Sequence, residues 1–130
     1  MRRLGETQRG RRATLATMLE KAAVAGDYTN PWARTPAIWR HFTDEGDILR
    51  GLQRQWSIEL GGALFAVIRD GAGDLASDVA VAHAETVARH HALYRVIEAH
   101  AEHPAIAEGR RKERRLLASA GLRKASLSVA

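Results

Sequence analysis

Apolar residues recur at helical spacing along most of the chain, and the pattern is strongest between residues 44 and 103. With an advance of about 100° per residue, it predicts two long helices, at 44–70 and 74–102. A short segment with two glycines, at 70–74, separates them, so the second helix should return antiparallel to the first. We therefore expect a helical hairpin over residues 44–103.

Three further segments have the pattern of helices: 11–25, a short one at 36–42, and 104–120. Alanine, leucine, arginine and glutamate, which are good helix formers, dominate the composition, and no run of residues indicates a strand. The predicted fold is all-α, an antiparallel bundle of about four helices built on the hairpin.

The helix at 44–70 has two apolar faces. One carries the tryptophan and leucines expected in the core, and a patch nearly opposite contains Ile58, Gly61 and Phe65. Two apolar faces indicate either a central helix or an interface with another chain. Gly61 and Gly62 inside a helix each cost roughly 1 kcal/mol relative to alanine, so we expect a close helix approach to compensate. Ile58, Gly61 and Phe65 are the predicted oligomer interface.

Polar side chains interrupt the core-facing side of the helix at 74–102. His83, Thr86 and His90 lie close together on that face, where apolar residues would be expected. Folding the hairpin at its turn brings Glu59 of the first helix near them. The sequence therefore predicts one buried cluster of Glu59, His83, Thr86 and His90.

Three interpretations of this cluster remain open: a satisfied polar group that fixes helix register, a ligand-binding or pH-sensing site, and a metal site. His83 and His90 are seven residues apart, roughly 10 Å along a helix, so both cannot bind one ion directly. Neither a Glu-x-x-His pair nor a His-Glu-x-x-His motif occurs. The structural interpretation is favoured, and no metal and no cofactor are predicted.

Charge is segregated along the chain. Residues 1–12 contain five arginines and one glutamate, residues 109–124 contain seven basic residues and one glutamate, and the middle is acidic. Basic ends of this kind can neutralise phosphates or an acidic surface. The residues predicted to contact nucleic acid or an acidic protein are Arg2, Arg3, Arg9, Arg11, Arg12, Arg110, Arg111, Lys112, Arg114 and Arg115.

The chain has no cysteine, which excludes thiolate metal sites and cysteine nucleophiles. It also has no phosphate-binding glycine loop, so an enzyme is the less favoured class. We expect a basic flexible arm at 1–12, one helical domain at 13–121 and a flexible tail at 122–130. The expected location is cytoplasmic, with no membrane contact.

The leading functional hypothesis is a non-enzymatic, homo-oligomeric interaction module whose basic ends contact nucleic acid or an acidic protein. The alternative is a helical bundle that binds a small molecule or metal around Glu59, His83 and His90.

Overall fold

The computed structural model describes residues 4–71 and 73–119, and within these ranges every regular element is helical. The all-α prediction is therefore confirmed, although five α-helices are present where about four were predicted. The α-helices are α1 (Leu4–Ala25), α2 (Glu45–Asp70), α3 (Leu75–Arg89), α4 (His91–Ala99) and α5 (Pro104–Ser119), and two short 3-10 helices, η1 (Pro31–Arg34) and η2 (Pro36–Arg40), lie between α1 and α2.

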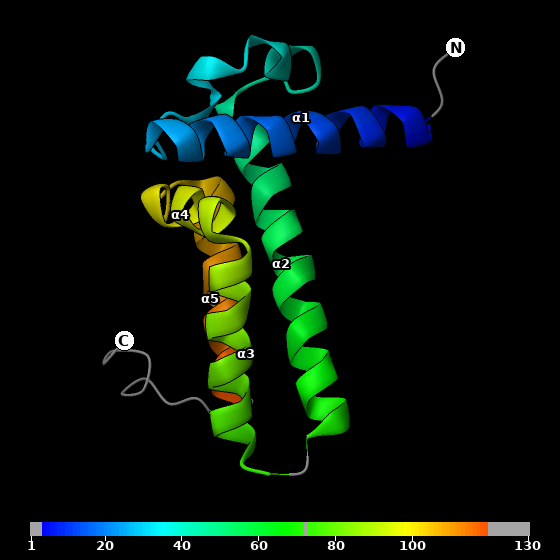
Figure 1. Ribbon diagram of the computed structural model, residues 1–130, viewed down its shortest axis with the longest axis vertical. Coiled ribbons are helices and arrows are strands. Elements are labelled where there is room, and N and C mark those ends of the chain that lie inside the picture. The colour runs from blue at the N-terminus through cyan, green and yellow to red at the C-terminus, as the bar shows by residue number, and fades with distance from the viewer. Residues whose placement is uncertain (1–3, 72, 120–130) are drawn as a thin grey trace.

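The predicted hairpin is present as α2 and α3, which run antiparallel, with α5 alongside them (Figure 1). Each arm begins at an aspartate that accepts a backbone N–H in its first turn. Asp44 accepts the N–H of Asp47 at 2.8 Å, and Asp74 accepts that of Ala76 at 3.1 Å. These caps satisfy donors that a helix start leaves unpaired, so the sequence fixes where both arms begin.

The predicted helix at 74–102 is wrong in its continuity, because it breaks at His90. This residue has φ −117° and ψ 46°, outside the helical region, and α4 leaves in a new direction beneath α1 (Figure 1). The backbone groups of His90 remain hydrogen-bonded at the break. Its N–H donates to the Thr86 carbonyl, and its carbonyl accepts the N–H of Tyr94. With those groups satisfied, a change of direction needs no glycine or proline, so the sequence contains no signal for it.

Helix α1 crosses the end of the hairpin that lies away from the turn (Figure 1). Leu15, Met18 and Ala22 form its buried face, as the periodicity predicts. The helix begins at Leu4, so residues 4–12, predicted as a flexible arm, are helical. Residues 1–3 and the predicted tail at 122–130 lie outside the described residues.

One hydrophobic core joins these elements. Its centre is the inner face of α2, on which Trp56, Leu60 and Leu64 are all 3% exposed or less. The residues that close on this face come from five other segments: Met18 of α1, Ile38 of η2, Val79 of α3, Leu93 and Ile97 of α4, and Ile106 and Leu117 of α5. In the described part of the chain, no helix is both long enough and apolar enough to cross a bilayer.

Candidate functional site

The predicted polar cluster is divided between two carboxylates. His90 Nε2 lies 3.2 Å from Glu59 Oε2, so Glu59 is near one of the two histidines predicted beside it. The His90 ring nitrogen makes no hydrogen bond to this carboxylate, so the contact becomes an ion pair only when His90 is protonated. His83 instead faces Glu113 of α5, with 3.6 Å between Nε2 and Oε2. Thr86 is buried and donates its hydroxyl to the Ala82 carbonyl at 2.7 Å. The prediction of a single cluster is therefore wrong.

Glu113 is the residue that sequence reasoning missed. Its Oε1 accepts the indole N–H of Trp56 at 2.7 Å, and its other oxygen faces His83, so one carboxylate connects α2, α3 and α5. The Glu113 side chain is only 16% exposed. One signal was available: Glu113 falls on the same helical face as Ile106 and Leu117, at spacings of seven and four residues, and so belongs to the buried side of α5.

Aromatic rings enclose this carboxylate. The Trp56 ring lies 5.1 Å from that of Tyr94, and the His83 ring meets both edge-on at 6.4 Å. Burial, together with the nearby Glu98 and Glu113 carboxylates, raises the pKa of Tyr94, while Arg110 beside it lowers that pKa. We call Trp56, His83, Tyr94 and Glu113 the Glu113 junction.

The Glu113 junction and the Glu59–His90 pair have the chemistry of structural contacts. No group of three or more histidine and acidic side chains able to hold a metal is found among the described residues. His83 and His90 each face a different carboxylate, so they do not converge on one ligand. What the junction does is hold α5 against the hairpin, because Glu113 meets a donor from α2 and a histidine from α3.

The arginines of α1 differ in what they contact. Arg11 is held within the chain: its guanidinium donates to the His41 carbonyl at 2.8 Å and lies 4.2 Å from the centre of the Phe42 ring. It also forms a 3.5 Å ion pair with Asp47. Arg9 and Arg12 are exposed. Arg11 therefore ties α1 to the start of α2, whereas Arg2 and Arg3 lie outside the described residues.

The basic segment of α5 is more open. Arg111, Arg114 and Arg115 are exposed, Lys112 is paired with Glu108 at 3.6 Å, and Arg110 is half-buried beside Tyr94. The start of α1 and the end of α5 lie at opposite ends of the molecule's long axis (Figure 1). The two predicted basic ends therefore form two separate surfaces.

The outer face of α2, which we define as Ile58, Gly61, Gly62, Phe65 and Ile68, has no cover from the described residues. Ile58 and Phe65 are each 64% exposed, and Ile68 is 54% exposed. A Cβ built on either glycine would meet nothing within 4 Å. The close helix approach predicted at Gly61 and Gly62 is therefore absent within the chain, because the helices that pack on α2 all lie against its opposite face.

A tight approach instead occurs at Gly109 of α5, where a Cβ would lie 2.5 Å from the amide nitrogen of Gln53 on α2. No local pattern distinguishes Gly109 from the glycine pair in α2, because the residue it contacts lies far away along the chain. Comparison with known proteins gives no family model, no curated protein and no solved structure that matches this chain.

Proposed function

We propose that the chain is a non-enzymatic interaction module, a helical bundle that pairs with a second copy of itself through the outer face of α2. The observation that carries this proposal is that Ile58 and Phe65 stand exposed on either side of two glycines above which there is open space. An exposed apolar stripe of this kind is typical of a protein interface.

The order of residues along the outer face favours a second copy as the partner. Suppose that two α2 helices cross antiparallel, with a two-fold axis between Gly61 and Gly62. Gly61 of one copy then lies opposite Gly62 of the other. Ile58 then lies opposite Phe65, twice. A two-fold interface uses the same patch on both subunits, so such self-complementarity is what it requires. The glycines let the backbones approach, and the large side chains pack on either side.

The charges beside the stripe are compatible with this pairing. The same register brings Arg54 opposite Arg69, which would repel if both were free. Arg69 is already held by Asp70 through two contacts of 2.9 Å, so its charge is compensated inside each copy. The remaining repulsion lies at the ends of the contact, where crossing helices diverge and solvent screens exposed charges.

Sedimentation velocity over a range of concentrations tests the proposal. Wild type should sediment as a dimer, and Phe65→Arg as a monomer with an unchanged circular dichroism spectrum. Val24→Arg is the matched control, because Val24 is 91% exposed on α1; it should remain dimeric. A wild type that stays monomeric at high concentration, or a Phe65→Arg variant as dimeric as wild type, would refute the pairing.

Disulfide formation tests the register, and the absence of cysteine from the chain gives a clean background. Gly62→Cys should cross-link to its own copy on oxidation, because it lies next to the proposed axis and a disulfide needs Cα atoms less than about 7 Å apart. Arg69→Cys should not, because in an antiparallel pair the two copies of residue 69 lie far apart. Equal cross-linking of both variants would indicate a parallel pair and contradict the register.

A second activity, polyanion contact, is favoured by Arg111, Arg114 and Arg115, which stand exposed on one side of α5. The expected ligand is duplex DNA, bound through its phosphates with an affinity that falls steeply as salt rises. Replacing these three arginines with glutamine should abolish binding at low salt, while Arg40→Gln, a remote exposed arginine, should not. No binding by wild type at low salt would remove this part of the proposal.

The alternative, a ligand or metal site around Glu59, His83 and His90, has less support. The two histidines face separate carboxylates, and Thr86, which lies between them on α3, is buried with its hydroxyl bonded to the Ala82 carbonyl. Thermal unfolding with and without zinc tests it directly, since a bound metal would raise the midpoint.

A further inference from the structure

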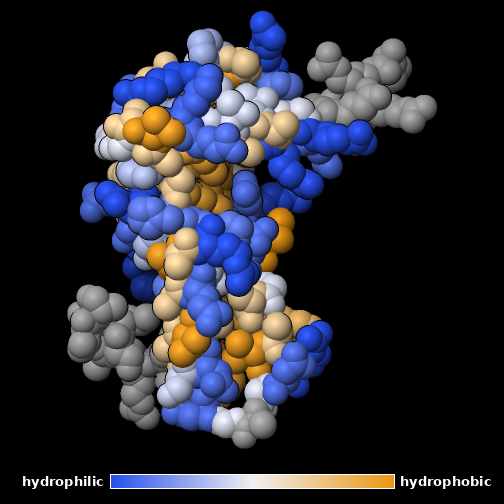
Figure 2. All heavy atoms as spheres, in the orientation of Figure 1, coloured by the Kyte–Doolittle hydropathy of each residue, from blue (hydrophilic) through white to orange (hydrophobic). Residues whose placement is uncertain are grey.

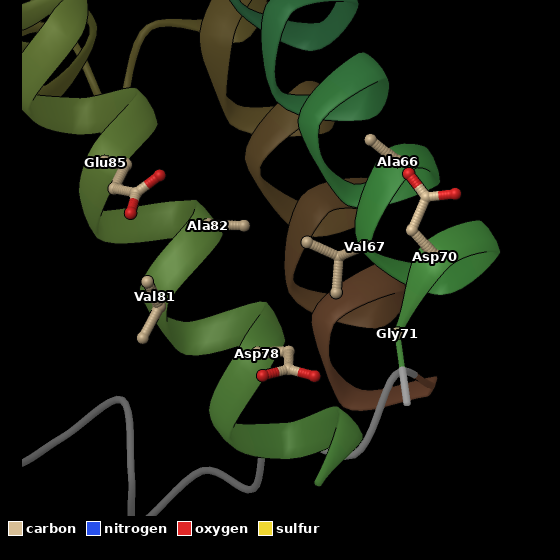
Figure 3. A pocket seen from close by; sticks show the side chains of 8 residues that line it. All are labelled: Ala66, Val67, Asp70, Gly71, Asp78, Val81, Ala82 and Glu85. Carbon is tan, nitrogen blue, oxygen red and sulfur yellow. The ribbon is translucent and has the colours of Figure 1, made fainter. Parts of the chain in front are cut away.

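A groove of about 430 Å³ runs between α2 and α3 near the turn of the hairpin. Helix α5 passes behind it (Figure 3), and the groove is open rather than enclosed. Val67 of α2 and Ala82 of α3 point toward one another across it, and Val81 borders it with 56% of its surface exposed. Hydrophobic atoms reach the surface over this lower part of the hairpin (Figure 2). The α2–α3 groove thus has an apolar floor of small side chains.

Carboxylates border the same groove. Asp78 and Glu85 line its α3 side, and Asp70 lines the α2 side. Asp70 is engaged by Arg69, whereas Asp78 and Glu85 have no ion-pair partner among the described residues. Seven residues separate these two, roughly 10 Å along the helix, which is the spacing of two helical turns.

We infer that the α2–α3 groove binds a basic amphipathic helix from another protein. A helix with small apolar side chains can approach Val67 and Ala82 closely, and lysines or arginines two turns apart on its flank would meet Asp78 and Glu85. The groove lies between two helices, which is the surface that helix-in-groove recognition uses. The partner is thus defined by charge complementarity and by the small size of the floor residues.

This surface is separate from the outer face of α2. Ala66, on the groove, and Phe65, on the outer face, are adjacent in sequence and so point about 100° apart around the helix. Val67 points further round, almost opposite the outer face. A helix bound in the groove therefore leaves Phe65 open, and the inference does not depend on self-association.

The test uses a fluorescently labelled synthetic helix of about 20 residues, built from alanine, leucine and lysine, with two lysines seven positions apart beside an alanine stripe. Its binding to the full chain is followed by fluorescence anisotropy at low salt. The matched probe carries glutamates in place of those two lysines. We expect the lysine probe to bind saturably and the glutamate probe to bind at least about tenfold more weakly. Equal binding of both probes would overturn the inference.

Variants of the chain locate the site. Asp78→Lys with Glu85→Lys should weaken binding of the lysine probe by about tenfold or more. Glu20→Lys with Glu102→Lys makes the same charge change at exposed positions elsewhere, and should leave binding close to wild type. Val81→Asn, which keeps the charge, should also weaken binding, because Val81 borders the groove. Equal losses in both double-lysine variants would show a general charge effect and refute the groove.

Two further measurements separate this inference from the proposed self-association. Phe65→Arg should bind the lysine probe as wild type does, even where it no longer dimerises. If Asp78→Lys with Glu85→Lys abolishes dimerisation while Phe65→Arg retains it, the groove holds a second copy and the inference of a foreign helix is wrong.

Discussion

The two faces of α2 contain similar residues and have opposite surroundings. On the inner face, Trp56 and Leu64 are 2% exposed or less, whereas Ile58 and Phe65 on the outer face are each 64% exposed. The same periodicity predicts both faces, because apolar side chains recur at helical spacing on each. What separates the buried face from the exposed face is whether another element of the chain covers it. Helices α3, α4 and α5 all pack on one side of α2, and no described residue covers the other side.

The glycines of the molecule show the same contrast. At Gly109, a side chain would meet Gln53 within 2.5 Å, while at Gly61 and Gly62 it would meet nothing within 4 Å. A glycine at a packed contact is required by the fold of the single chain. A glycine pair in open space reduces helix stability with no return inside that chain, which is consistent with a role in contact between chains.

The largest effect is expected for Trp56→Ala. The change leaves a large cavity in the inner face and removes the hydrogen bond to Glu113, so the free energy of unfolding should fall by about 3–5 kcal/mol. Urea denaturation at a concentration where the protein is monomeric measures it. Phe65→Ala removes an aromatic ring from the outer face. Under the same monomeric conditions it should lower the free energy of unfolding by less than about 1 kcal/mol. Similar losses for the two variants would mean that the outer face is covered within one chain.

A smaller effect, with opposite signs at two sites, is expected for glycine replacements. Gly109→Ala forces its methyl group against Gln53 and should lower the free energy of unfolding by about 1–3 kcal/mol. Gly61→Ala should raise the free energy of unfolding of the monomer by up to about 1 kcal/mol, because alanine favours the helix. The same Gly61→Ala variant should dimerise more weakly, since the added methyl groups separate the crossing helices. A stabilised monomer with unchanged dimerisation would contradict close contact at Gly61.

The smallest effect concerns Asp47, which holds the start of α2 to α1. The hydrogen bond from the Thr43 N–H, aided by Arg11 and Arg50, lowers the pKa of Asp47 below its usual value of 3.8. A carboxyl whose pKa is lower in the folded state stabilises the protein above its unfolded-state pKa, and this contribution is lost as the pH falls through the folded-state pKa. Asp47→Asn should therefore cost less than about 1 kcal/mol at neutral pH.

This loss should vanish in acid. Denaturation curves of wild type and Asp47→Asn, recorded between neutral pH and pH values below 3.8, should converge at the acid end. Glu20→Gln, at an exposed carboxylate of α1, is the matched control and should follow wild type throughout. A constant difference at every pH would show that the carboxylate charge is not responsible.

Much of the fold follows from local sequence signals. The hairpin, the position of its turn and the inner face of α2 depend on residues close together in the chain, and the predictions for them hold. The hairpin also predicts that Glu59 lies near the polar residues of the second helix, but it does not predict that Glu59 meets His90 while His83 meets Glu113. The break at His90 does not follow, because no residue there disfavours a helix and packing alone redirects α4.

The rest of the candidate site depends on contacts between distant segments. Glu113 lies 57 residues from Trp56 in the chain, and no local pattern states how α5 lies against the hairpin. The basic run around Glu113 also masks it, because five neighbouring cations suggest an exposed surface. The basic run at the N-terminus likewise predicts Arg11 on a partner surface, whereas its guanidinium contacts Phe42 and Asp47 of the same chain.

The placement of α1 and α4 at one end of the hairpin has a consequence for local opening. That end is covered by several elements, whereas among the described residues the turn end of α2 packs only against α3 and α5 (Figure 1). Backbone amides near residues 64–70 should therefore exchange with deuterium sooner than those near residues 48–56. The outer face and the groove both border this softer end. Binding of a partner to either surface should first slow deuterium exchange in the last turns of α2. Exchange in the core around Trp56 should change only later.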